Sequence, residues 1–352
     1  MCGGDSKTWV GGNMKFLVVG LGSMGKRRIR NLQYLKAGEI IGFDLQENRC
    51  KEVEERYGIK TFRKFDDAMS EDPDAFIIST PPDKHIEYAL IAAENNKHFF
   101  TEASVLADGM DKLIALCKNK NIVAAPSCTM RFHPAVKKIK ELVDNKIIGK
   151  ILAFTYHSGQ YLPDWHPWED YRSFYVARKE TGACREIVPF ELTWLTWVLG
   201  GIDTISCFKG KLTKLDIEID DAYQIIMKFK SGVLGHILVD VISRVPYRVC
   251  KLISEEGLII WDWGEGVKVY TAKDKSWMEY PEESGTTVEG YSEKIKEEPY
   301  IEEMNHFIRA IRGEIRYPYT LEEDKKILNI LYAAEKSSEK SIHLAVNGEE
   351  GR

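Results

Sequence analysis

The chain of 352 residues carries a formal net charge of −5, with 44% hydrophobic and 29% charged residues. This length suits about two domains, and the composition excludes a predominantly disordered or fibrous chain. The negative charge argues against a broad nucleic-acid-binding surface. Seven cysteines without a Cys-X-X-Cys pair are typical of reduced thiols in a cytoplasmic protein, not of a disulfide framework or a zinc site. The apolar runs are shorter than the roughly 18 residues that span a bilayer, so we expect no membrane segment.

The N-terminal part of the chain predicts alternating strands and helices. Residues 1–13 are Gly-rich without periodicity, and we expect a flexible tail there. Short apolar runs then alternate with longer helical segments, which is typical of a parallel sheet with right-handed βαβ crossovers. The expected strands are 16–20, 39–44, 75–79, 98–101 and 122–125, and the expected helices are 23–35, 47–57, 83–95 and 109–118.

Beyond about residue 150 the pattern changes to successive strands. Lys230-Ser231-Gly232 separates two of them and is a hairpin-turn signal. The order predicts an α+β region built on an antiparallel meander. The expected strands are 151–157, 204–211, 222–229, 233–242, 248–254, 258–263 and 267–271, and the expected helices lie near 134–143, 189–199, 300–312 and 321–337.

A glycine motif joins the first predicted strand to the first predicted helix. It reads Gly20-Leu21-Gly22-Ser23-Met24-Gly25. In a dinucleotide-binding fold, Gly20 allows the tight turn, Gly22 lets the backbone approach a pyrophosphate at the helix N-terminus, and Gly25 permits close helix packing. In this context, we interpret the motif as a dinucleotide site, although a glycine turn without a ligand has the same pattern.

Asp44 ends the second predicted strand. Its carboxylate would accept hydrogen bonds from the adenosine ribose and repel a 2′-phosphate, which favours NAD(H) over NADP(H). Arg49 and the basic run 26–28 weaken that preference. After the third strand, residues 79–85 (Ser-Thr-Pro-Pro-Asp-Lys-His) form a rigid exit where a nicotinamide half could lie, or simply a stiff turn with a helix cap.

Several segments together resemble the glucose–fructose oxidoreductase / inositol dehydrogenase / MocA (Gfo/Idh/MocA) family. They are VVGLGSMG at 18–25, ISTPPDKH at 78–85, HFFTEAS at 98–104, the stretch 130–151 and AAEKSSEKS at 333–341, and the resemblance covers about residues 15–345. It implies an α/β protein, in which a Rossmann domain precedes an α+β domain with a large, mostly antiparallel open sheet. It also implies NAD(P)-dependent hydride chemistry on a sugar, cyclitol or nucleotide-sugar hydroxyl.

The resemblance sets the expected organisation. We expect a flexible tail at 1–13, an NAD-binding Rossmann domain at 14–126, and a substrate and oligomerisation domain at 127–345 whose last helices pack back on the first domain. Residues 346–352 are expected to be a tail. The resemblance implies a homodimer or homotetramer through the open sheet. The predicted cofactor is NAD, and the predicted cofactor-binding residues are Gly20, Gly22, Ser23, Met24, Gly25, Asp44, Thr80, Pro81, His85 and Glu102.

The chain departs from the family pattern at its acid/base positions. The family's Glu-Lys-Pro is Glu102-Ala103-Ser104, so Ala103 stands where the family has lysine. In the later segment Phe190 aligns with the usual histidine, Glu186 lies near the usual aspartate, and Thr193 replaces a second aspartate. Two proton-transfer groups are therefore missing together.

Replacement acid/base groups are expected in residues 157–186, which are rich in polar and aromatic side chains. The predicted catalytic residues are Glu186, His166 and Tyr161. The predicted substrate-binding residues are Arg131, Tyr175, Arg178 and Arg185, because guanidinium groups match a carboxylate or phosphate. A loop histidine such as His166 is more often a surface or packing residue than a base, and Glu186 could pair with Arg185 or Arg131. No metal-ligand spacing is found, so no metal is predicted.

Three functions remain open from the sequence. The first is an NAD-dependent oxidoreductase with relocated acid/base residues, acting on a small-molecule substrate, with an anionic sugar as one candidate. The second is a glycosidase, epimerase or lyase that recycles NAD within each turnover. The third is a catalytically silent NAD-binding scaffold, suggested by Ala103 and Phe190.

Overall fold

The computed structural model describes residues 14–166, 169–282, 284–288 and 293–346. The chain divides into two compact units. Unit 1 comprises residues up to Ser127 together with Tyr300–Asp324, and unit 2 comprises Cys128–Pro299 and the chain from Lys325. The predicted N-terminal tail, and all but the first residue of the predicted C-terminal tail, lie outside the described residues.

Unit 1 contains a parallel sheet, as predicted. Its strand order is β3-β2-β1-β4-β5-β6, and every adjacent pair is parallel. The inner strands read almost wholly apolar because both faces of a parallel sheet are covered by helices. Over the described residues the strands are β1 Met14–Val19, β2 Gly38–Phe43, β3 Lys60–Phe62, β4 Ala75–Ile78, β5 His98–Thr101 and β6 Ala124–Pro126.

Alternate side chains of β1 enter two apolar layers. Phe16 and Val18 pack with Ile29 of α1 and Phe307 of α8, whereas Leu17 and Val19 belong to the other layer. This alternation follows from the period of two in a strand. The helices of unit 1 are α1 Ser23–Tyr34, α2 Glu47–Tyr57, α3 Phe65–Met69, α4 His85–Glu94, α5 Met110–Cys117 and α8 Glu298–Ile311, with a 3₁₀ turn η1 at Pro82–Lys84.

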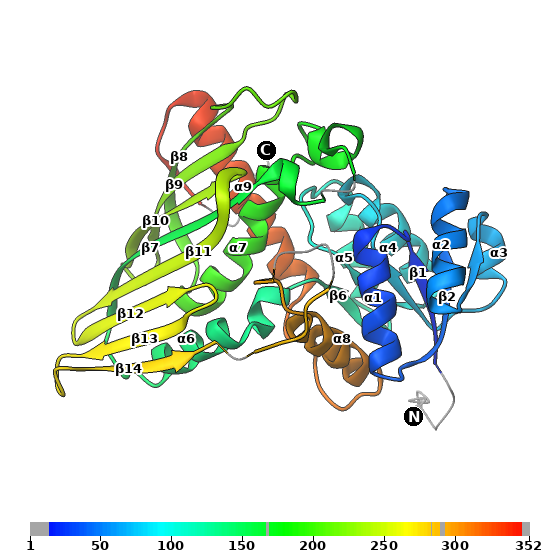
Figure 1. The fold of residues 1–352 in the computed structure, drawn as a ribbon, viewed down its shortest axis with the longest axis horizontal. Helices are drawn as coiled ribbons and strands as arrows, with labels where there is room; N and C mark the ends of the chain where they lie inside the picture. Colours follow the sequence, from blue (N-terminus) through cyan, green and yellow to red (C-terminus); the bar gives the residue numbers. More distant parts are fainter. Residues whose placement is uncertain (1–13, 167–168, 283, 289–292, 347–352) are drawn as a thin grey trace. The chain divides into compact units, whose positions relative to one another are not determined.

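Unit 2 contains a mostly antiparallel sheet, also as predicted. Its strand order is β14-β13-β12-β11-β7-β10-β9-β8-β15 (Figure 1). The described strands are β7 Ile151–Tyr161, β8 Ile202–Gly210, β9 Ala222–Phe229, β10 Leu234–Asp240, β11 Ile242–Ser254, β12 Gly257–Asp262, β13 Gly266–Thr271, β14 Ser276–Pro281 and β15 Leu344–Ala345. Gly232 adopts φ +89° in the predicted hairpin turn.

The prediction of an antiparallel meander was wrong at one strand, β7. β7 lies between β10 and β11 and pairs parallel with β10. The carboxylate of Asp240 accepts the N–H groups of Ile242 and Ser243. These bonds reverse the chain between β10 and β11 around the end of β7, where Val241 accepts the N–H of Leu162.

Helices cover one face of this sheet (Figure 1). They are α6 Pro134–Asp144, α7 Ala183–Leu199 and α9 Leu321–Lys340, and the 3₁₀ turns of unit 2 are η2 Thr129–Phe132, η3 Leu162–Asp164, η4 Tyr171–Ser173 and η5 Tyr175–Ala177. Glu191 of α7 is fully buried and accepts bonds from Tyr156 (2.7 Å), Ser158 (3.0 Å) and Arg248 Nε (2.9 Å). The buried ion pair with Arg248 therefore joins α7 to β11, and the two hydroxyl hydrogen bonds join α7 to β7.

Helix α7 begins six residues before the predicted start at Pro189, since Ala183–Val188 are already helical. A proline inside a helix removes one backbone hydrogen bond, and the buried contacts along α7 keep the helix continuous through it. Over the described residues, none of the helices combines the length and apolar character needed to cross a membrane.

Candidate active site

The glycine motif of unit 1 forms a tight loop between β1 and α1. Gly20 has φ +91°, and a Cβ there would lie 2.7 Å from the carbonyl oxygen of Ser79. A Cβ on Gly25 would lie 1.9 Å from the carbonyl oxygen of Gly20. Neither position accepts a larger residue without moving backbone. The loop therefore brings the start of α1 close to the carboxyl end of β1.

The N-terminus of α1 is open to an anion. Its N-cap is Gly22, which provides no side-chain cap, and the first turn, which includes Ser23 and Met24, has no acidic residue. The first N–H groups of a helix and its dipole favour a bound negative charge. This end of α1 therefore fits a pyrophosphate.

Asp44 lies beside the loop, directly after β2. It is buried, and its two oxygens accept the N–H groups of Leu21 and Gln46, both at 2.8 Å. Arg49 Nη1 lies 3.7 Å from Asp44 Oδ2. The carboxylate is thus fixed in place where the sequence predicted ribose recognition.

The basic run 26–28 is occupied by contacts within unit 1. Lys26 pairs with Glu52 at 2.7 Å. Arg28 is fully buried and binds Glu102 at 2.6 Å and Glu303 at 2.9 Å. Burial opposes the charge of Arg28, but the two carboxylates raise its pKa above the usual value. The guanidinium of Arg28 thus holds Glu102 at the end of β5, and Ala103 follows with no ionisable group.

Polar atoms without partners gather after β4. Ser79 Oγ, Thr80 Oγ1 and His85 Nδ1 are buried and have no hydrogen-bond partner among the described residues. His85 Nε2 lies 2.9 Å from the Thr80 carbonyl, and burial lowers the pKa of this imidazole. Buried polar atoms almost always have partners, so these atoms mark a place for the polar groups of a ligand. Pro81 lies exposed in the same turn.

The predicted catalytic carboxylate lies in unit 2. Glu186 is in the first turn of α7, and Tyr175 donates its hydroxyl to Glu186 Oε1 at 3.2 Å. A helix N-terminus stabilises an ionised carboxylate. Phe190 follows one turn later and has no group that exchanges a proton. The structure thus brings two predicted residues, Glu186 and Tyr175, into contact.

The other two predicted catalytic residues lie in or next to the aromatic segment after β7. His166 stacks on Phe174 with ring centroids 5.4 Å apart, and its Nδ1 lies 3.7 Å from Glu169. Tyr161 is the last residue of β7, and the guanidinium of Arg244 lies 3.8 Å from its ring centroid. Residues 167 and 168 of this segment lie outside the described residues.

The predicted substrate-binding arginines differ in their surroundings. Arg131 Nε donates to the carbonyl of Thr193 at 3.3 Å, and Arg185 Nε lies 2.6 Å from Glu335. Both guanidinium groups are thus engaged within unit 2. The side chain of Arg178 is exposed.

Unit 2 contains one further polar cluster, which was not predicted from the sequence. His157 Nε2 lies 2.6 Å from Asp240, and the Tyr247 hydroxyl lies 2.6 Å from His157 Nδ1. The three residues belong to different strands that are adjacent only in the folded sheet. No local sequence signal could have indicated this cluster.

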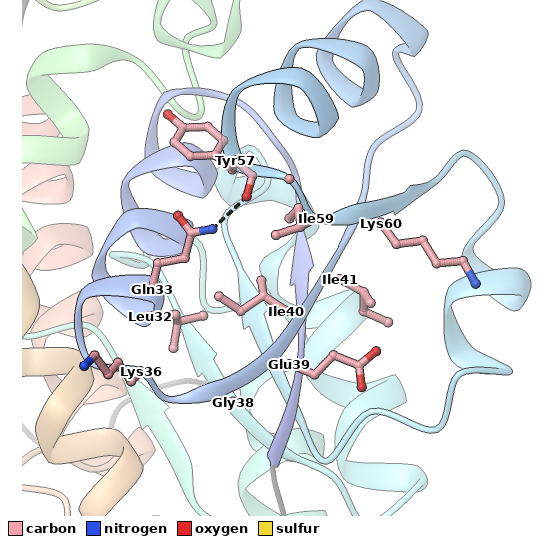
Figure 2. Close-up of a pocket in the computed structure, with 11 residues that line it drawn as sticks. Leu32, Gln33, Lys36, Gly38, Glu39, Ile40, Ile41, Tyr57, Ile59 and Lys60 are labelled. Carbon is pink, nitrogen blue, oxygen red and sulfur yellow. Dashed lines mark hydrogen bonds between the residues drawn. The ribbon is translucent and has the colours of Figure 1, made fainter.

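A cavity of about 580 Å³ lies at the other edge of the parallel sheet. Its lining comes from the amino ends of β2 and β3 and the carboxyl ends of α1 and α2 (Figure 2). Gln33 Nε2 bonds the Tyr57 carbonyl at its rim. None of the predicted site residues lines it, so it is separate from the candidate cofactor site.

Two sequence profiles of one family match this chain. The profile described as the oxidoreductase family with an NAD-binding Rossmann fold matches residues 14–126. The profile of the GFO/IDH/MocA C-terminal domain matches residues 136–260.

Two characterised relatives have similar sequences. The myo-inositol 2-dehydrogenase of Thermotoga maritima is 25% identical over 340 residues, covering 93% of this chain and 96% of the relative. The levoglucosan dehydrogenase of Pseudarthrobacter phenanthrenivorans is 25% identical over 243 residues, covering 60% of this chain and 62% of the relative.

Solved structures share the fold. Levoglucosan dehydrogenase in complex with NADH and levoglucosan superposes with a TM-score of 0.83 at 18% identity, covering 96% of this chain and 100% of that one. The WlbA dehydrogenase of Bordetella pertussis, in complex with NADH and UDP-GlcNAcA, gives a TM-score of 0.78 at 16% identity, covering 95% and 97%. At these identities the likeness concerns the fold.

Proposed function

Because the chain belongs to the Gfo/Idh/MocA family of oxidoreductases, with their NAD-binding Rossmann domain, we propose that it interconverts a hydroxyl and a keto group on a sugar, cyclitol or nucleotide sugar. The relatives named for myo-inositol and levoglucosan support a cyclic polyhydroxylated substrate. Exposed Arg178 supports a substrate that carries a negative charge.

The residues of unit 1 fit NAD. The glycine loop and the open N-terminus of α1 would hold the pyrophosphate, and Asp44 would accept the ribose hydroxyls. The unpartnered atoms of Ser79, Thr80 and His85 would receive hydrogen bonds from the nicotinamide half. When bound, NAD supplies the hydride acceptor or donor.

The proton must move at the substrate oxygen, and the side chain that we assign to this step is Glu186. Removing hydride from a carbinol carbon requires loss of the hydroxyl proton, and Ala103 and Phe190 carry no group for it. The observation that carries this assignment is the 3.2 Å bond from Tyr175 to Glu186 in the first turn of α7. Tyr175 orients the carboxylate, which accepts the proton during oxidation and returns it during reduction.

The experiment that tests the function is a hydride-transfer assay. The purified chain is incubated with NAD⁺ and a panel of cyclitols, neutral sugars, uronates and nucleotide sugars, and NADH is followed at 340 nm. We expect NADH to form with at least one class. A chain that binds NADH tightly but reduces no NAD⁺ with any class would instead be a scaffold or an enzyme that recycles its cofactor. Analysis of the reaction mixtures for products separates these two. An enzyme that recycles its cofactor forms a product without net NADH, whereas a scaffold forms none.

We also propose that unit 2 forms a homo-oligomer through the face of its sheet opposite α7. Strand register places five large apolar side chains on that face. They are Phe208, Ile226, Leu234, Ile253 and Trp277, exposed by 71%, 52%, 56%, 40% and 48%. Large apolar side chains exposed on one face are typical of an interface, and the face suits a second copy of the same sheet.

A further inference from the structure

One aromatic side chain lies partly exposed on the same face of α7 as Glu186. Phe190 follows Glu186 by four residues, and residues at this spacing are neighbours on a helix surface. Four residues advance a helix by about 6 Å, and helical side chains lean toward the N-terminal end. The ring of Phe190 therefore leans toward the carboxylate that we assign to proton transfer.

The same helix surface is covered beyond Phe190. Thr193 and Trp197 continue the stripe at helical spacing. The carbonyl of Thr193 accepts Arg131 Nε, and the guanidinium carbon of Arg131 lies 5.8 Å from the Trp197 ring centroid. Lys140 Nζ lies 5.6 Å from the same centroid. Side chains of η2 and α6 thus cover the later part of the stripe.

The aromatic side chains linked to Glu186 already have ring partners. Phe174 stacks on His166 with centroids 5.4 Å apart and meets Tyr175 edge-on at 5.8 Å. Tyr175 in turn donates its hydroxyl to Glu186. Among the described residues, no other aromatic ring and no cation stacks on Phe190. Its partly exposed ring can therefore meet a ligand that reaches Glu186.

The two side chains suit the two kinds of surface on a sugar or cyclitol ring. The hydroxyl groups lie mainly around the edge of such a ring, and C–H bonds point from its faces. The face of an aromatic ring carries a partial negative charge and attracts C–H groups. Binding pockets combine such apolar walls with a few polar groups that fix the orientation of the ligand. Glu186 provides the polar group and Phe190 the apolar wall.

We propose that the ring of Phe190 stacks on a C–H face of a cyclic substrate, and that this contact favours sugar and cyclitol rings over open-chain polyols. The stacked ring presents one hydroxyl to Glu186. An open-chain polyol has no comparable flat C–H face, so it gains less from the aromatic ring. The proposal rests on the proposed function for the reaction and adds the residue that selects the shape of the substrate.

Phe190→Leu tests the contact because it removes the aromatic face and keeps an apolar side chain. We expect the KM of the best cyclic substrate to rise roughly threefold to tenfold, with kcat changed by less than about twofold. Phe190→Met is a second variant without a ring and has the same expectation. Phe190→Tyr keeps the aromatic face, and its KM should stay within about twofold of the unaltered chain.

The measurement combines initial rates at saturating NAD⁺ with calorimetric titration of the same cyclic substrate into the chain saturated with NADH. The titration gives the substrate affinity without turnover. The inhibition constant of an open-chain polyol with the same number of carbons is measured in the same assay, and Phe190→Leu should leave it nearly unchanged. Thermal melting shows that each variant folds.

Tyr34→Leu is the matched control. It also exchanges an aromatic ring for leucine, and Tyr34 is 72% exposed in unit 1. It should leave KM, kcat and the substrate affinity unchanged.

Three results would overturn this proposal by itself. The first is an unchanged KM and substrate affinity in the folded variants without a ring. The second is an equal loss of affinity for the cyclic substrate and the open-chain polyol. The third is a loss in Phe190→Tyr as large as that in Phe190→Leu. An unaltered chain that forms no NADH with any class of substrate would overturn the proposed function, and this proposal with it.

Discussion

Gly25 meets a steric limit in the loop between β1 and α1. Its α-carbon faces the Gly20 carbonyl so closely that a methyl group would lie 1.9 Å from that oxygen. The loop backbone, not a flexible side chain, would have to move. Because the same loop sets the start of α1, the position of the helix N–H groups depends on this one contact.

We therefore expect Gly25→Ala to weaken NADH binding by about tenfold or more. The added methyl pushes α1 away from the loop and misplaces the pyrophosphate donors. Gly210→Ala is the matched control, because a Cβ at Gly210 meets no atom within 4 Å. Fluorescence titration of NADH measures both. Equal affinity of the two variants would contradict the requirement for close packing at Gly25.

The loop geometry could be predicted from the sequence because the glycine spacing acts over six neighbouring residues. The partners of the arginines could not. Arg185 meets Glu335 150 residues later, and Arg28 meets Glu303 275 residues later. The Glu335 partner of Arg185 could not be predicted because it becomes a neighbour only through the tertiary fold.

At the scale of elements, the apolar strands and the amphipathic helices could be predicted. The three-residue β3 (Lys-Thr-Phe) and the five-residue α3 (Phe-Asp-Asp-Ala-Met) were missed because they are short and contain no apolar run. β14 was missed because its side chains are mostly exposed and show no apolar alternation. The parallel pairing of β7 with β10 depends on long-range order, so local turns gave no sign of it.

The N-cap of α6 is His133, a buried histidine whose side chain can take up a proton. His133 Nδ1 accepts the N–H of Ala135, and Nε2 lies 3.6 Å from Glu282. Burial, with the nearby charge of Arg248, lowers the pKa of His133 to about 3 from 6.5. Between these values the unfolded chain binds a proton that the folded chain does not. The free energy of unfolding therefore falls as pH falls below about 6.5, by about 1.4 kcal/mol per pH unit.

His133→Asn should remove this dependence, since asparagine caps a helix without titrating. We expect the unaltered chain to lose about 2 kcal/mol more than the variant between pH 7 and pH 5. Urea unfolding at both pH values measures the difference. Burial raises the pKa of Glu282, which changes the free energy of unfolding with pH in the opposite direction. Because both chains contain Glu282, this contribution largely cancels when the two chains are compared. The same loss in both chains would show that His133 does not titrate as described.

For the whole molecule, the mostly antiparallel sheet of unit 2 offers a surface for self-association in addition to its part in the candidate site. One of its faces packs against helices, and the other carries the five exposed apolar side chains. The resemblance to the family implied an oligomer. Composition could not indicate one, because residues distant in sequence gather into a surface patch only once the strands pair in register.

We expect the chain to be a dimer or larger in solution, and Ile226→Lys combined with Leu234→Lys to shift it to a monomer. Charges at two adjacent positions of the face would be buried without partners in the interface. Light scattering after size exclusion gives the mass. Tyr34→Glu is the control, because Tyr34 is 72% exposed in unit 1. A mass unchanged by the double variant would place the interface elsewhere.

We assign the proton transfer of an NAD-dependent oxidation to Glu186. The most direct measurement is kcat of Glu186→Gln with saturating NAD⁺ and the best substrate from the panel, beside NADH affinity of the same variant. We expect kcat to fall about 10²- to 10⁴-fold and the NADH affinity to stay unchanged. A variant that keeps the kcat of the unaltered chain would contradict it.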